Sequence, residues 1–215
     1  MRRIRKFLPA NGLLLVFFLL CSGCTFFKST PDQTRLFSIG FRREKPVATS
    51  IDRARIRILM GHFPDYLDSP QIITKIGPNE LRSNSRYRWA TSLPENILHI
   101  VRRHIQQNFP KARIYAFPKD SACKIDYTLR LDIDALEIHE TAQEVTFSGT
   151  WTFLNASHEL VNCSPFEFHK SFGGVADRYG EMVAKVEQVI LDLGDAIAKQ
   201  MDFLLLKKDE TADKT

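Results

Sequence analysis

The sequence lacks the motifs that mark most enzymes and metal sites. It has no G-x-S-x-G turn for a nucleophilic serine, no H-E-x-x-H pair and no calcium-binding loop. Asp65 and Asp68 are close enough in sequence to form a carboxylate pair, and His62 could join them as a metal ligand. Pro64 and Pro70 bracket both aspartates, however, and aspartate is common in turns because its side chain bonds to nearby backbone. We therefore predict no enzyme activity, no metal and no cofactor.

The N-terminal apolar run is too short to cross a bilayer, which takes about 20 residues as a helix. It covers the eight residues 13–20 and follows four basic residues within positions 2–6. Ser22 and Gly23 then precede Cys24. A basic start, a short apolar middle and small residues at the end are typical of a secretory leader.

The end of this leader resembles the lipobox of bacterial lipoproteins. The resemblance implies diacylglycerol on the Cys24 sulfur, cleavage of the Gly23–Cys24 bond and acylation of the new amine. Cys21 departs from the pattern, and lipidation there would put Leu20 at the small-residue position. The alternative is an ordinary leader that leaves Cys24 as a thiol. By resemblance to enterobacterial sorting rules, Thr25, which stands where inner-membrane retention uses aspartate, favours the outer membrane.

The mature chain also lacks a large net charge. The whole sequence has 30 basic and 25 acidic residues, a net charge of +5. Four of the 30 basic residues and no acidic residue lie in the leader, so cleavage leaves 26 against 25, a net charge of +1. Because a near-neutral domain has no electrostatic footprint for nucleic acid, we exclude nucleic acid as a partner.

Cysteine is scarce, and only Cys123 and Cys163 follow Cys24. An envelope location permits a disulfide between them. In a simple three-stranded meander they would start the first and third strands, about 9–10 Å apart. A disulfide needs Cα atoms within roughly 7 Å, so two buried free thiols are the alternative.

The remaining pattern predicts one domain over residues 34–206, after a leader at 1–23 and a polar tether at 24–33. The charged residues 207–215 are predicted to be a disordered tail. Alternating or short apolar runs predict strands over residues 34–41, 54–60, 72–76, 80–89 and 112–117. The segment 80–89 fits either two short strands or one bent strand.

A helix is predicted from Ser92 to about residue 108. Ser92 and Glu95 have the spacing of a capping box, and Pro94 lies in the first turn. His104 falls on the apolar stripe of this helix, where it could be a proton-transfer or metal group. We interpret it instead as a hydrogen-bonded histidine at the margin of the core.

A long β pattern follows. Polar and apolar residues alternate over 125–133 and 145–153, and a third strand falls near 160–172. One polar and one apolar face are typical of an antiparallel sheet covered on one side. A last helix over residues 178–205 has an apolar stripe that suits this cover. The predicted fold class is therefore α+β, a mostly antiparallel sheet covered by two main helices.

The segment 62–89 concentrates residue types that carry binding energy at protein interfaces, among them Tyr66, Arg88 and Trp89. One interpretation is a docking surface. The other is that Leu67 and Trp89 fill the core while the arginines are solvated.

This segment resembles the PqiC/YmbA family of ABC-type transport auxiliary lipoproteins. The resemblance rests on PDYLDSPQII at residues 64–73, NEL at 79–81, RWA at 88–90 and Leu93 at the helix start. The lipobox and the chain length agree with it. Thr91 and Ser92 depart from it, because the family often has an acidic residue and proline there.

The resemblance implies a non-enzymatic outer-membrane lipoprotein that faces the periplasm. Such proteins work with an inner-membrane MCE-domain protein, in some systems with an ABC permease and ATPase, to move lipids between membranes and maintain membrane integrity. The residues implied in docking, or in holding the docking loop, are Asp65, Tyr66, Gln71, Glu80, Arg88 and Trp89. A partner that forms a ring or tube would suggest that this chain forms a homo-oligomer as well. The alternatives are a lipoprotein that assists assembly of lipopolysaccharide or outer-membrane proteins, and a carrier with lipid in its own cavity.

Overall fold

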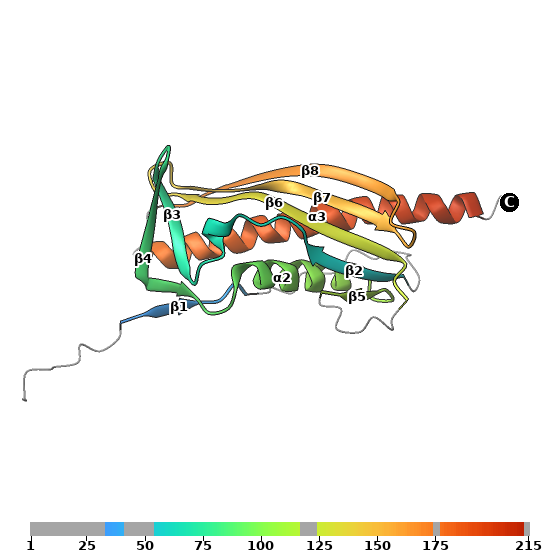
Figure 1. The fold of residues 1–215 in the computed structure, drawn as a ribbon, viewed down its shortest axis with the longest axis horizontal. Helices are drawn as coiled ribbons and strands as arrows, with labels where there is room; N and C mark the ends of the chain where they lie inside the picture. The colour runs from blue at the N-terminus through green and yellow to red at the C-terminus, as the bar shows by residue number, and fades with distance from the viewer. Residues whose placement is uncertain (1–32, 41–53, 117–123, 174–176, 213–215) are drawn as a thin grey trace, which may run out of the picture. The chain divides into compact units, whose positions relative to one another are not determined.

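The described part of the chain forms an eight-stranded mixed sheet with two long helices on one face (Figure 1). The computed structural model describes residues 33–40, 54–116, 124–173 and 177–212, with side chains as far as Leu205. The leader, Cys24, the tether up to residue 32 and Cys123 lie outside these residues. Predictions that concern them therefore stay predictions.

Three long strands form the predicted antiparallel meander. β6 (Tyr127–His139) pairs with β7 (Glu144–Asn155), and β7 pairs with β8 (Leu160–Ser171). Apolar side chains of β6 and β7 alternate inward into the core while polar ones face outward. The predicted polar face and apolar face are therefore both present.

The second edge of β6 is shared by two different strands. β2 (Arg55–Met60) runs parallel to the first part of β6. β3 (Gln71–Gly77) reaches β6 only near its end, where Lys75 pairs with His139. Among the described residues, no strand therefore lies beside the middle of β6 on this edge.

Shorter strands extend the sheet from β2 and β3. β5 (Arg113–Tyr115) lies parallel to β2, and β4 (Glu80–Trp89) forms one continuous strand antiparallel to β3. β1 (Arg35–Phe37) lies parallel to β4. The sequence pattern did not reveal these parallel pairs, because the partners are far apart in the chain. The sheet is nevertheless mostly antiparallel, as predicted.

Two amphipathic helices cover the apolar face. α2 (Leu93–Asn108) packs against β2, β5 and α3, and α3 (Arg178–Ala212) packs along β7 and β8 (Figure 1). α3 continues past residue 205, so residues 207–212, which were predicted to be a disordered tail, extend the helix. Neither described helix combines the length and hydropathy that a membrane crossing requires.

The start of α2 differs from the predicted capping box. Ser92 is the N-cap, but its side chain makes no capping hydrogen bond. An N-cap side chain normally bonds to the second or third N–H of the helix. Pro94 occupies the second position and has no N–H, which removes one of the two donors.

His104 is a hydrogen-bonded core histidine, as interpreted from the sequence. Its side chain is buried, and Nε2 lies 2.6 Å from Oδ1 of Asp195 on α3. The contact joins the two helices. The other ring nitrogen, Nδ1, is buried and has no hydrogen-bond partner among the described residues. No group of three metal-ligating side chains occurs among the same residues.

Cys163 lies exposed on β8, which contradicts the expectation of a buried thiol at this position. It belongs to the polar outer face, opposite Thr152 of β7. Cys123 lies outside the described residues, so the pairing of the two cysteines stays a prediction.

Gly149 of β7 should be intolerant of any side chain. It lies opposite Ile133 at the bulge of β6, and a Cβ there would collide with the backbone oxygen of Asp132. We expect Gly149→Ala to lower the free energy of unfolding by about 1–3 kcal/mol. Gly77→Ala is the matched control, because its Cβ would meet Glu80 at an ordinary 3.6 Å. Equal denaturant midpoints for the two variants would contradict this account.

Candidate functional site

Residues 61–70, called the notch loop below, fill the gap on the edge of β6. The Gly61 backbone N–H donates to the Leu131 oxygen at 2.7 Å. The Ile133 N–H donates to the His62 oxygen at 2.9 Å. The loop thus supplies partners to backbone groups that would otherwise be unpaired in the middle of the sheet.

Asp132 fixes the start of the notch loop. Its Oδ1 accepts hydrogen bonds from the His62 backbone N–H at 2.8 Å and from Nη2 of Arg130 at 2.8 Å. Burial acts to raise the pKa of Asp132, but the hydrogen bonds from Arg130 and His62 outweigh it and hold the pKa below its usual 3.8. The ionised carboxylate is therefore the form that the fold favours.

The notch loop turns inward at Leu67, in the short 3-10 helix η2 (Asp65–Leu67). Leu67 and Trp89 are 5% and 7% exposed, so both fill the core. This agrees with the second of the two interpretations open from the sequence. The Trp89 N–H also donates to the Pro70 oxygen at 2.8 Å, which ties the end of the loop to β4.

Leu67, Gln71 and Trp89 line a small cavity under the loop, closed below by Val186 of α3. Its volume is about 10 Å³, which is room for about one water molecule. This cavity is therefore far too small for a phospholipid.

The structure brings some of the predicted docking residues together and separates others. Asp65 and Tyr66 lie exposed on η2, and Tyr66 is 39% exposed. Gln71 and Arg88 are neighbours in the register of β3 and β4. Glu80 lies apart from them, at the tip of the β3–β4 hairpin.

Asp65 and Asp68 belong to one turn rather than to a catalytic pair. Both are exposed, and the Asp68 N–H donates to the Asp65 backbone oxygen at 3.2 Å. This is the turn role expected for aspartate between two prolines.

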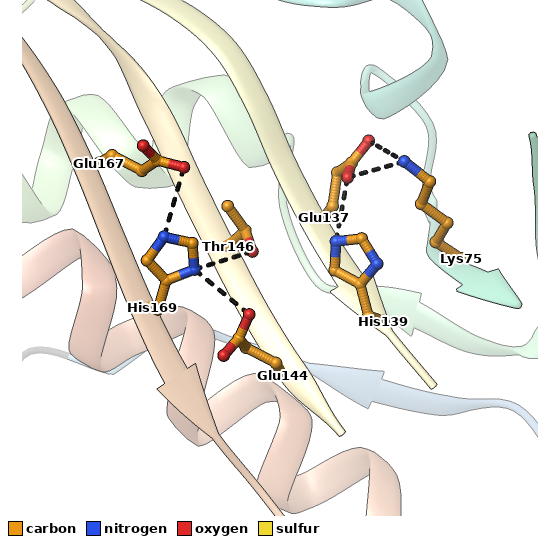
Figure 2. Close-up of polar contacts among 7 residues, drawn as sticks. All are labelled: Lys75, Glu137, His139, Glu144, Thr146, Glu167 and His169. Carbon is orange, nitrogen blue, oxygen red and sulfur yellow. Dashed lines mark hydrogen bonds and ion pairs between the residues drawn. The ribbon is translucent and has the colours of Figure 1, made fainter. Parts of the chain in front are cut away.

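A row of charged side chains continues from the notch loop across the outer face of the sheet. Figure 2 shows the row, called the His–Glu strip below: Lys75, Glu137, His139, Glu144, Glu167 and His169. Nζ of Lys75 lies 2.8 Å and 2.9 Å from the two oxygens of Glu137. Nε2 of His139 lies 3.0 Å from Oε2 of the same carboxylate.

The second histidine of the strip lies between two glutamates (Figure 2). Nδ1 of His169 lies 3.2 Å from Oε1 of Glu144 and 3.2 Å from the hydroxyl of Thr146. Its Nε2 lies 3.3 Å from Oε1 of Glu167. The strip therefore carries three carboxylates and one lysine, and it is acidic when both histidines are neutral.

Tyr66 borders the strip. Burial raises the pKa of Tyr66, and the nearby charge of Glu137 adds to the effect. An open groove adjoins the strip on the other side, with walls that include Ile76, Pro78, His139 and Ala142. Together these elements give one end of the outer face an aromatic side chain, an acidic row and a groove.

Glu140 locks the elements at this end together. Its side chain is only 11% exposed, and its oxygens lie 2.6 Å from the Thr74 hydroxyl, 3.1 Å from Nη1 of Arg82 and 3.5 Å from Nη1 of Arg178. These partners belong to β3, β4 and α3. One carboxylate therefore fixes the hairpin and the helix start relative to β6.

Sequence reasoning missed the strip and Glu140. The alternation of polar residues along each strand was visible. Which side chains lie next to one another on adjacent strands depends on the strand register, and the register could not be predicted from the sequence. Only the position of Tyr66 in the recognised segment pointed to this surface.

The arrangement suits the binding of a partner. It offers a partly exposed aromatic ring, charged groups already paired with one another and an open groove. Among the described residues, no cluster of three His, Cys, Asp or Glu side chains could hold a metal ion.

Comparison with known proteins gives the family. A family model described as the ABC-type transport auxiliary lipoprotein component matches residues 42–198. The chain belongs to this family, whose members are transport auxiliary lipoproteins rather than a class of enzymes. No curated protein sequence matches the chain.

Two solved structures share the fold. A protein from Xanthomonas campestris has a TM-score of 0.67 at 14% identity, over 84% of this chain and 99% of the other. An uncharacterised protein has a TM-score of 0.64 at 15% identity, over 78% of this chain and 98% of the other. At such low identity the likeness extends to the fold alone.

Asp132 should make the stability of the fold depend on acidity. Its pKa in the folded state lies below 3.8, so its contribution is complete above that pH and is lost as the pH falls through the folded value. We expect Asp132→Asn to lower the free energy of unfolding by about 1 kcal/mol at neutral pH, and the deficit to shrink as the pH falls below 3.8. Thermal unfolding as a function of pH measures this.

Asp134→Asn is the control, because Asp134 lies exposed at the neighbouring bulge. It removes the same charge without touching the notch loop. A difference between Asp132→Asn and the native protein that does not shrink at any pH below 3.8 would show that ionisation of Asp132 does not contribute.

Proposed function

We propose that this chain is a non-enzymatic outer-membrane lipoprotein that faces the periplasm and docks to an MCE-domain protein of the inner membrane. In this role it supports lipid movement between the membranes and membrane integrity, in a system that includes an ABC permease and ATPase. The family supports the transport role. The leader and Cys24 support the lipid anchor, and Thr25 supports the outer membrane.

The position of Tyr66 carries the docking proposal. The ring is partly exposed on a loop that Asp132 and backbone hydrogen bonds hold in place. Interfaces commonly place such an aromatic at the centre of a polar rim. Asp65 and the His–Glu strip form that rim, whereas Gln71, Arg88 and Trp89 act as supports behind the loop.

The charge of the strip indicates the surface that it would meet. Three carboxylates against one lysine favour a partner segment rich in lysine or arginine. The hairpin tip at Glu80 would extend the contact along the same end of the sheet.

A single substitution at the ring tests the docking site. We expect Tyr66→Ala to weaken binding of the MCE-domain partner about thirtyfold, as loss of a central aromatic typically costs about 2 kcal/mol. The measurement is co-purification of that partner from detergent-solubilised envelopes, followed by a binding titration with the purified pair.

Phe203→Ala is the matched control, since Phe203 is an exposed aromatic on α3, on the other face of the sheet. It should leave the affinity unchanged. Equal affinities for the native protein, Tyr66→Ala and Phe203→Ala would contradict the proposal that Tyr66 lies in the docking site. Recovery of lipopolysaccharide or outer-membrane protein assembly factors instead of an MCE-domain protein would favour the envelope-assembly alternative.

A further inference from the structure

The outer face of the sheet carries a second charged region, formed by β2, β5 and β6. The parallel registers place Arg55 beside Arg113 and Arg57 beside Thr128. Arg130 follows Thr128 by two residues and therefore lies on the same face. Arg55, Arg57, Arg113 and Arg130 are called the arginine patch below.

Two of these arginines are neutralised by aspartates. Arg55 makes a bidentate contact with Asp126, with Nη2–Oδ1 and Nε–Oδ2 distances of 2.9 Å and 3.0 Å. Arg130 binds Asp132 with an Nη2–Oδ1 distance of 2.8 Å. Both aspartates are therefore already occupied.

Arg57 and Arg113 keep their positive charge uncompensated. Nη2 of Arg57 donates to the Thr128 hydroxyl at 3.2 Å, but its Nε is enclosed and has no hydrogen-bond partner among the described residues. An anion bound at the guanidinium would offset the uncompensated positive charge of Arg57. Arg113 is exposed and forms no ion pair with a described residue.

Apolar side chains extend the same row of the sheet. The registers run from Tyr115 through Arg57 and Thr128 to Leu154 and Leu160. Leu160 is 63% exposed and the adjacent Val161 is 38% exposed. Uncompensated arginines therefore lie on one surface with exposed aliphatic side chains.

We propose that the arginine patch, together with Leu160 and Val161, is a contact site for a membrane surface that contains anionic phospholipids. Guanidinium groups pair with the phosphates of the headgroups, and the aliphatic side chains enter the boundary between headgroups and acyl chains. A free phosphate would use the arginines but would gain nothing from the aliphatic side chains. The inference goes beyond the docking function above, because it uses other residues and needs no protein partner.

Native mass spectrometry of the full-length protein in non-ionic detergent micelles tests the site. Phosphatidylglycerol and phosphatidylcholine are titrated separately, and lipid adducts are counted. We expect a preference for phosphatidylglycerol that falls about thirtyfold in the double variant Arg57→Gln/Arg113→Gln, at about 1 kcal/mol per arginine and 1.4 kcal/mol per tenfold.

The double variant Arg86→Gln/Arg102→Gln is the control, because it removes the same charge from β4 and α2. It should keep the preference. The single variant Arg113→Gln is also measured. Because Arg113 is exposed, this variant should keep the fold even if the double variant is destabilised by loss of the Arg57–Thr128 contact. Leu160→Asn should weaken phosphatidylglycerol binding without affecting binding of inorganic phosphate.

Three results would overturn the proposal. Equal numbers of phosphatidylglycerol and phosphatidylcholine adducts would show that the site does not recognise the charge of the lipid. Full competition by inorganic phosphate with no effect of Leu160→Asn would identify a simple anion site. A dimer that the arginine variants abolish would show that the patch instead meets the acidic strip of a second copy.

Discussion

The structure depends on the divided edge of β6. β2 covers its first part and β3 its end, and the notch loop must supply the backbone partners between them. Unpaired backbone groups in the middle of a buried sheet would each cost about as much as a lost hydrogen bond. The loop is therefore held in one conformation by the core itself, with Leu67 inward and Tyr66 outward.

This constraint fixes the position of a surface feature, the Tyr66 ring on the notch loop. Glu140 secures the hairpin and α3 at the same end, so the His–Glu strip and Tyr66 keep their relative positions. The outer face is acidic at this end and basic at the arginine patch. Such a separation of charge would allow the basic partner and the anionic lipid surface proposed above to be bound at the same time.

Much of the fold could be predicted because the local periodicity of apolar residues indicates strands and helices. The meander, the two helices and the fold class follow from alternation and helical spacing. The parallel pairs of β1, β2 and β5 could not be predicted, since they join segments far apart in the chain. The length of α3 was underestimated because residues 207–212 have no apolar pattern.

The site was only partly predictable for a related reason. From composition alone, Tyr66 and Trp89 were equally good candidates for a binding residue. Their burial distinguishes them, because Tyr66 borders the His–Glu strip and Trp89 fills the core. The strip itself is assembled by register across β6, β7 and β8. No pattern within a single strand could show that His139 and His169 would lie among glutamates.

Photo-crosslinking in living cells tests the central claim most directly. A photo-reactive residue at Tyr66 should capture an MCE-domain protein, whereas the same residue at Trp89 should react only within the chain, because Trp89 is buried. Capture at Tyr66 and not at Trp89 is the result that this account predicts. No partner adduct at Tyr66, with the protein folded and at the membrane, would contradict it.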